Sequence, residues 1–189
     1  MISPSDFRKR WGEDDDAEPL VIFPAAILAG VSVPDVSTAF LTNAGLPESA
    51  APFLNFQLPK TATLQSVSEL WQRGSEFGCY RVIGSNGSDD PVCLDESRDG
   101  QIVYLNHDND FQRVLINSTV PQLAESLLSY EHLVSETQSR NGEDAYLDGD
   151  VPDDLQQWLT DELHRIDAIA LGANGFWTDE LDNLRLNAT

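Results

Sequence analysis

The hydrophobic residues of this chain follow a helical spacing at both ends and an alternating, strand-like spacing in the middle. Near the N-terminus, Phe7 and Trp11 lie four residues apart, which predicts a short first helix. A strand is then expected at residues 20–23 and a second helix at 34–44. Gly45 suits the end of that second helix because glycine accepts a positive φ.

Beta-branched and aromatic residues dominate five segments in the middle of the chain. Asn86-Gly87 and Asp99-Gly100 lie between these segments and favour tight hairpin turns. Strands joined by such short turns are antiparallel neighbours. The predicted strands are Phe53–Gln57, Gly78–Gly84, Val92–Asp95, Gln101–Asn106 and Val114–Ile116.

Helical spacing returns after Thr119, a predicted N-cap, and continues to Val134. Residues 135–150 are polar and lack a period, so a mobile connection is expected there. Another helix is predicted from Asp153 and a last short helix after Thr178. The residues expected to bury the inner side of the helix from Asp153 are Leu155, Trp158, Leu159, Leu163 and Ile166.

This order of elements predicts an α+β fold, in which one antiparallel β-sheet of about four to six strands is covered on one face by N- and C-terminal helices. The 189 residues suffice for one domain with its own core. Within that single domain (1–189) we expect an N-terminal extension at 1–32, which contains an acidic linker at 13–18, and a core at 33–184.

The charge balance is strongly acidic. Eleven basic residues stand against 32 acidic ones, a net charge of −21, and residues 131–189 alone carry −11. Such a surface repels nucleic acid and anionic membranes and attracts basic protein surfaces, although solubility alone is a sufficient explanation. The charged N-terminus does not resemble a signal peptide, and the longest apolar run is interrupted by Pro24, so we expect a cytoplasmic protein.

Seven acidic residues lie in or beside the predicted turns. An EF-hand calcium loop needs acids at its first, third and fifth positions, but the segment after Asp90 continues with apolar strand residues. No metal ligand is therefore assigned, and adventitious ion binding stays open. Among 32 acids a catalytic carboxylate pair has no specific signature. We interpret these residues as hairpin ends that form one acidic rim: Asp89, Asp90, Asp95, Glu96, Asp99, Asp108 and Asp110.

Other chemical signatures are missing from the sequence, including GxSxG, HExxH and a Walker lysine after GSNGSDD. Cys79 and Cys93 are expected as small strand residues without a disulfide. No catalytic residue and no cofactor is predicted. Phe176 and Trp177 belong to the core or to a partner contact, and the core is favoured because aromatic residues dominate core burial.

Several short motifs, taken in order, resemble the SUKH superfamily of bacterial immunity proteins, most closely its fourth family. The resemblance runs from about Val33 to Leu184. The motifs are Gly45-Leu46-Pro47, Ile83-Gly84, the Asp95–Gly100 turn, Asn117-Ser118 and Phe176-Trp177.

The resemblance implies a non-enzymatic domain that binds and neutralises a cognate toxin of a polymorphic toxin system, often a nuclease. It also implies structural roles for the motifs: Gly45 and Gly100 in backbone turns, Asn117 in capping and Trp177 in packing. The negative charge suits a toxin with a basic surface. We expect the acidic rim, with acids of the C-terminal third, to contact that toxin, and neither nucleic acid nor membrane to bind directly.

Two alternatives stay open. Fungal cell-wall-synthesis regulators belong to the same superfamily, so the chain could serve as a regulatory or scaffold module with a partner that is not a toxin. An enzyme that uses its acidic residues is the second alternative. The sequence does not indicate the oligomeric state.

Overall fold

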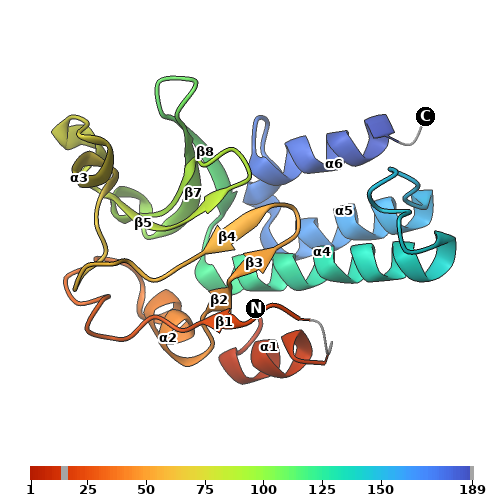
Figure 1. Cartoon of the computed structure of the whole chain (residues 1–189), viewed down its shortest axis with the longest axis horizontal. Helices are drawn as coiled ribbons and strands as arrows, with labels where there is room; N and C mark the ends of the chain where they lie inside the picture. Colours follow the sequence, from red (N-terminus) through yellow and green to blue (C-terminus); the bar gives the residue numbers. More distant parts are fainter. Residues whose placement is uncertain (14–16, 188–189) are drawn as a thin grey trace.

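The computed structural model describes residues 1–13 and 17–187, so residues 14–16 of the expected acidic linker lie outside the described residues. Helices and strands follow one another in the predicted order of helices, then strands, then helices (Figure 1). In chain order, the elements are α1 (Pro4–Trp11), β1 (Leu20–Val21), α2 (Asp35–Asn43), β2 (Leu46–Pro47), β3 (Ser49–Ala50), β4 (Leu54–Phe56), α3 (Val67–Trp71), η1 (Ser75–Phe77), β5 (Tyr80–Asn86), β6 (Pro91–Asp95), η2 (Glu96–Arg98), β7 (Gln101–Asn106), β8 (Gln112–Asn117), α4 (Val120–Asn141), α5 (Asp153–Asp167), η3 (Ala168–Leu171) and α6 (Phe176–Asn187).

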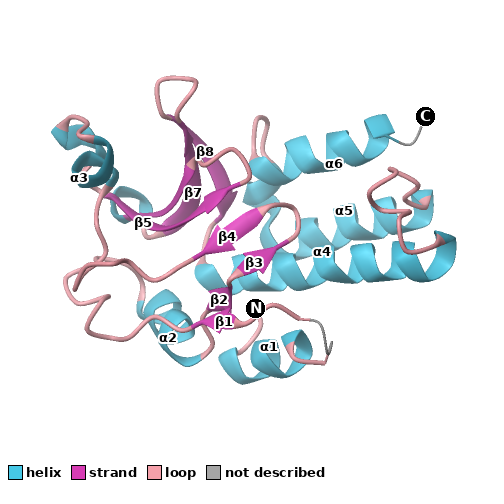
Figure 2. Cartoon of the chain, viewed as in Figure 1, coloured by secondary structure: helices cyan, strands magenta, loops and turns pink. Residues whose placement is uncertain are grey.

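The main sheet has six strands in the order β3-β4-β5-β6-β7-β8, and every neighbouring pair is antiparallel. The predicted α+β fold with consecutive antiparallel strands is therefore confirmed. Asp99 and Gly100 both adopt positive φ, 52° and 70°, at the turn between β6 and β7, as the hairpin signal requires. A second, two-stranded sheet pairs β1 with β2 beside the β3–β4 hairpin (Figure 2).

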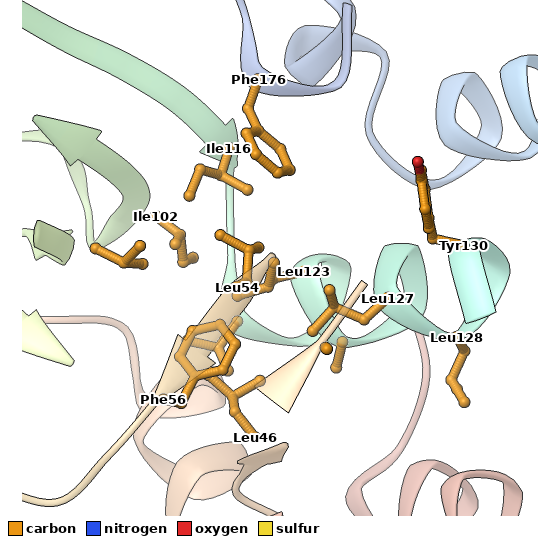
Figure 3. Packing of buried hydrophobic residues seen from close by; sticks show 14 of the residues in the cluster. Leu46, Leu54, Phe56, Ile102, Ile116, Leu123, Leu127, Leu128, Tyr130 and Phe176 are labelled. Carbon is orange, nitrogen blue, oxygen red and sulfur yellow. The ribbon is translucent and has the colours of Figure 1, made fainter. Parts of the chain in front are cut away.

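One face of the main sheet is buried against α4 and the helices that follow it. Leu54, Ile102 and Ile116 of the sheet pack with Leu123 and Leu127 of α4 in one apolar cluster (Figure 3). Each such side chain contributes roughly 1.5–3 kcal/mol when fully buried. Trp177 belongs to the same cluster and is fully buried, which confirms its expected place in the core.

The opposite face of the sheet is also partly covered, whereas the sequence predicted cover on one face only. Cys93, Val103 and Leu105 alternate with the residues of the first face and pack under Val67 of α3. This helix has only five residues, too few for a periodic signal, and a capping box between Ser66 and Glu69 fixes its start. The hydrogen bonds from Ser66 lower the pKa of the Glu69 carboxyl.

Helix α4 is longer than its hydrophobic pattern predicts, since it continues through residues 135–141 of the expected connection. Packing against α5 supports this polar end, where the Arg140 guanidinium lies 2.7 Å from the Asp154 carboxylate. Helix α6 begins at Phe176, ahead of the expected start after Thr178. In the part of the chain that the structure describes, no helix is both long and apolar enough to cross a membrane.

Candidate partner-binding surface

The seven acidic residues expected to form one rim lie at two opposite ends of the main sheet. In an antiparallel meander, successive connections alternate between the two ends of the strands. The connections 51–53, 87–90 and 107–111 therefore share one end, which we call the three-turn end. The connection 96–100 lies at the other end, here called the far end.

At the far end, Asp95 is a structural residue. Its side chain is fully buried and accepts hydrogen bonds from Arg113 Nε at 2.8 Å and from the backbone N–H of Ser97 at 3.0 Å. This second bond closes the η2 turn. A buried carboxylate with a guanidinium partner is not available to a protein that docks from outside.

Glu96, also at the far end, is held within the chain as well. Its two carboxylate oxygens accept hydrogen bonds from Arg81 Nε and from the backbone N–H of Ser32, each at 2.7 Å. The exposed Asp99 shares its turn with Arg98. The far end therefore combines its three acidic residues with arginines and carries little net negative charge.

At the three-turn end, Asp90 links two of the turns. Its buried carboxylate accepts hydrogen bonds from the backbone N–H of His107 at 2.8 Å and from the amide of Asn86 at 3.0 Å. The His107 ring nitrogen Nδ1 lies 2.7 Å from Oδ1 of Asp90, the oxygen that accepts the His107 backbone N–H. These contacts hold the turn 87–90 against the turn 107–111.

The remaining acids of the three-turn end, Asp89, Asp108 and Asp110, are exposed. Asp89 and Asp110 have positive φ of 61° and 49°, a conformation that aspartate accepts more readily than most residues. The connections 51–53, 87–90 and 107–111 contain four aspartates and neither lysine nor arginine, although the Arg73 guanidinium from the β4–β5 connection lies 4.4 Å from the centroid of the Phe111 ring. The structure therefore brings together Asp89, Asp90, Asp108 and Asp110, and it separates them from Asp95, Glu96 and Asp99.

An exposed aromatic residue at the three-turn end was missed by the sequence reasoning. Phe53 was expected inside a strand, but β4 begins one residue later and Phe53 lies in the β3–β4 turn, with 67% of its surface exposed. The preceding Pro52 was the available signal, since proline cannot donate a hydrogen bond to a sheet ladder.

The other residues considered for metal binding, thiol chemistry or family motifs have structural surroundings. Among the described residues, no group of three or more His, Cys, Asp or Glu side chains could hold a metal ion. Cys79 and Cys93 are free thiols, and burial raises the pKa of the Cys93 thiol well above its usual value. Asn117 is not the cap of α4, because the Thr119 hydroxyl accepts the hydrogen bond from the Gln122 N–H instead. Gly45 and Gly100 have positive φ, in agreement with their expected turn roles.

Comparison with known proteins identifies the family. The model of the SUKH-4 immunity protein family matches residues 5–183, so the match includes the N-terminal helix and most of the expected extension. No curated protein and no solved structure matches the chain. With a family match over nearly its whole length and the α+β fold that the motif order implies, the chain belongs to the SUKH-4 immunity protein family.

Proposed function

We propose that this chain is a non-enzymatic immunity protein that binds and neutralises a cognate toxin with a basic surface, and that the toxin is a nuclease of a polymorphic toxin system. The three-turn end carries the proposal. Its connections place four aspartates together, which outnumber the Arg73 guanidinium stacked on Phe111, on a chain whose net charge is −21.

An acidic inhibitor suits a partner that handles nucleic acid. A nuclease contacts phosphates with lysine and arginine side chains, so its substrate-binding surface is positively charged. An acidic protein is attracted to that surface over a distance set by the salt concentration, and it can cover the surface once bound. This mode of inhibition needs no catalytic residue on the inhibitor. A toxin that cleaves nucleic acid acts where nucleic acid lies, so its inhibitor has to bind it there. This supports the cytoplasm as the site where the chain acts.

The geometry supports a smaller contact surface than the seven acidic residues expected from the sequence. We assign Asp89, Asp108 and Asp110 to the contact, with exposed acids of the C-terminal third as a further source of attraction. We do not assign Asp95 and Glu96 to it, because both are engaged by arginines of this chain. Asp90 acts indirectly, since it holds the turns 87–90 and 107–111 together.

Co-purification with the C-terminal toxin domain encoded by the adjacent gene tests the proposal. The pull-down is run at about 0.05 M and about 0.5 M NaCl, which changes the Debye length about threefold. A complex that forms, suppresses nuclease activity and weakens with salt would support immunity by electrostatic capture. Absence of any complex with a neighbouring toxin, together with stable capture of another protein, would favour a regulatory or scaffold role instead.

A further inference from the structure

Phe53 is an unusual residue for a folded chain. The protein has eight phenylalanines, all within the described residues, and the other seven are buried or half-buried. Phe7, Phe23, Phe40 and Phe56 are at most 1% exposed, whereas Phe53 is 67% exposed. An aromatic side chain that stays in water adds little to the stability of its own fold.

The backbone conformation at Phe53 also disfavours phenylalanine at this position. Its φ is +67°, in the left-handed region that favours glycine and asparagine and that bulky residues rarely adopt; Phe111 shares this conformation, with φ of 59°, but its side chain is buried in the core. The position would be less strained with glycine. Neither burial nor backbone conformation therefore explains a phenylalanine here, and residues kept in such conformations are frequent at binding sites.

Phe53 lies next to the acidic turns. Leu54 pairs with Asn86, so the turn 51–53 is adjacent to the turn 87–90. A Cβ atom added to Gly87 would lie 3.0 Å from Cβ of Phe53, which shows how closely the two turns approach. The Asp90–His107 contact then joins the turn 107–111 to the same surface. Phe53 therefore shares the three-turn end with Asp89 and Asp108.

We propose that Phe53 is the apolar anchor of the toxin-binding surface and that the partner offers an apolar pocket bordered by lysine or arginine side chains. This inference rests on the proposed function and identifies how the contact is made. Interfaces of this type owe most of their affinity to a few anchor residues, among which aromatic side chains are common, and surrounding charges mainly set the rate of encounter. Phe53 then determines how long the complex lasts, while Asp89, Asp108 and Asp110 determine how quickly it forms.

A second copy of this chain is a poorer occupant of the same surface. In a symmetric dimer the same patch contacts itself, so the aspartates of one three-turn end would face those of the other. Like charges brought together across an interface oppose association. The charge of the three-turn end thus favours a basic partner over self-association.

Binding kinetics test the inference with the full chain and the purified, catalytically inactivated toxin domain encoded by the adjacent gene. Phe53→Ala is compared with Leu147→Ala, a matched loss of an apolar side chain that is 77% exposed and lies in the loop between α4 and α5. We expect Phe53→Ala to raise the dissociation rate at least about tenfold and to change the association rate less than about threefold. Leu147→Ala should leave both rates within about twofold, and urea unfolding should show that both variants remain folded.

The outcomes distinguish failure of the Phe53 assignment from failure of the proposed immunity function. If the wild-type chain binds the toxin and Phe53→Ala dissociates at the wild-type rate, the anchor assignment is wrong and the immunity function stands. If the wild-type chain does not bind the toxin, the proposed function fails and the anchor assignment fails with it. Sedimentation of the free chain adds one more decisive result: a wild-type dimer that Phe53→Ala converts to monomer would identify a second copy as the occupant and overturn the proposal.

Discussion

The indole N–H of Trp177 donates a hydrogen bond to the side-chain oxygen of Asn117 at 3.0 Å, and both side chains are completely buried. The Asn117 amide in turn lies 3.4 Å from the Asp167 carboxylate, which also accepts the backbone N–H of Ser118 at 2.6 Å. One buried polar network therefore joins the end of β8, the end of α5 and the start of α6. It accounts for two of the family motifs, Asn117-Ser118 and Phe176-Trp177, as parts of a single packing arrangement.

Asn117→Ala should destabilise the fold strongly. The change leaves the buried Trp177 N–H without its acceptor and removes a donor to Asp167. A buried polar group that loses its partner costs about 1–3 kcal/mol, so we expect a loss of about 2 kcal/mol or more in the free energy of unfolding. Urea unfolding measures this loss. Asn43→Ala removes an exposed asparagine side chain from α2 and should cost less than about 1 kcal/mol.

A double-mutant cycle shows whether the network acts as a unit. Trp177→Phe removes the donor from the other side of the same hydrogen bond. Because each single change already breaks the bond, we expect the double variant to lose about 1 kcal/mol less than the two single losses added together. Strict additivity would mean that the hydrogen bond between the two side chains contributes nothing of its own.

Sequence patterns predict strands and turns whose signal lies within a few neighbouring residues. They do not predict contacts between distant segments, such as those in the network around Asn117. Beta-branched runs and the Asp99-Gly100 turn specify β6 and β7 because the information lies within neighbouring residues. The family resemblance implied a capping role for Asn117, but its partner Trp177 lies sixty residues further along the chain. A single sequence has no signal for such a pair.

Among the acidic residues, one contact could not be predicted from the sequence, whereas their division between two ends of the sheet could have been. The pairing of Asp95 with Arg113 depends on the side chain of Arg113 reaching from β8 to β6, which no local pattern records. The division between two ends of the sheet, in contrast, follows from the predicted topology alone. Antiparallel neighbours with short turns place Asp99 opposite Asp89 and Asp108, so a single rim was already incompatible with the predicted meander.

Asp95→Ala should reduce stability rather than binding. It removes the carboxylate that accepts hydrogen bonds from Arg113 and the Ser97 N–H, and it leaves the half-buried guanidinium with the neutral Gln101 side chain but without its carboxylate partner. Breaking a buried pair in this way costs about 3–5 kcal/mol when burial is complete, and we expect about 2–3 kcal/mol because Arg113 is partly exposed. Thermal or urea unfolding measures the loss. Asp108→Ala, at an 88% exposed side chain, is the control and should stay within about 0.5 kcal/mol of wild type.

Neutralising the three-turn end should slow association with the toxin. We propose the triple variant Asp89→Asn, Asp108→Asn and Asp110→Asn, because asparagine accepts the positive φ of residues 89 and 110 as aspartate does. At low salt the association rate should fall about tenfold, and the difference should shrink at high salt as the charges are screened. Stopped-flow or surface-binding kinetics at several salt concentrations provide the measurement.

A control variant with the same change in net charge locates the effect. Asp144→Asn, Asp148→Asn and Asp150→Asn remove three exposed charges from the loop between α4 and α5. If this control slows association as much as the three-turn variant, attraction depends on total charge and the three-turn end has no special part. A clearly larger effect of the three-turn variant than of the control would place the contact at the three-turn end.

The Glu180 carboxyl contributes to the free energy of unfolding, and this contribution decreases as the pH rises toward neutrality. Burial on α6 raises the pKa of the Glu180 carboxyl to about 7, and the adjacent Asp179 carboxylate adds to the shift. The Glu180 charge also contributes to the raised pKa values of the buried Tyr130 and the half-buried Tyr146, whose hydroxyl groups lie 3.1 Å apart. These neighbours offer the ionised carboxylate no positive charge.

The sign of the pH effect follows from the direction of the shift. The folded protein holds the Glu180 proton more tightly than the unfolded chain, in which the glutamate pKa is about 4.5. The contribution is therefore fully present below pH 4.5, decreases between pH 4.5 and about 7, and is lost above pH 7. Glu180→Gln keeps the side chain uncharged at every pH, so it should be more stable than wild type at pH 8 and similar to it at pH 4.5.

Thermal unfolding at the two pH values measures this difference. We expect Glu180→Gln to gain about 1 kcal/mol at pH 8, less than the full shift would give because the carboxyl is only partly buried. Asp182→Asn alters an exposed carboxylate two residues away on α6, which pairs with Arg185 at 3.1 Å, and it should show no such gain. An equal Tm for Glu180→Gln and wild type at both pH values would mean that solvent reaches Glu180 freely and that burial on α6 does not govern its titration.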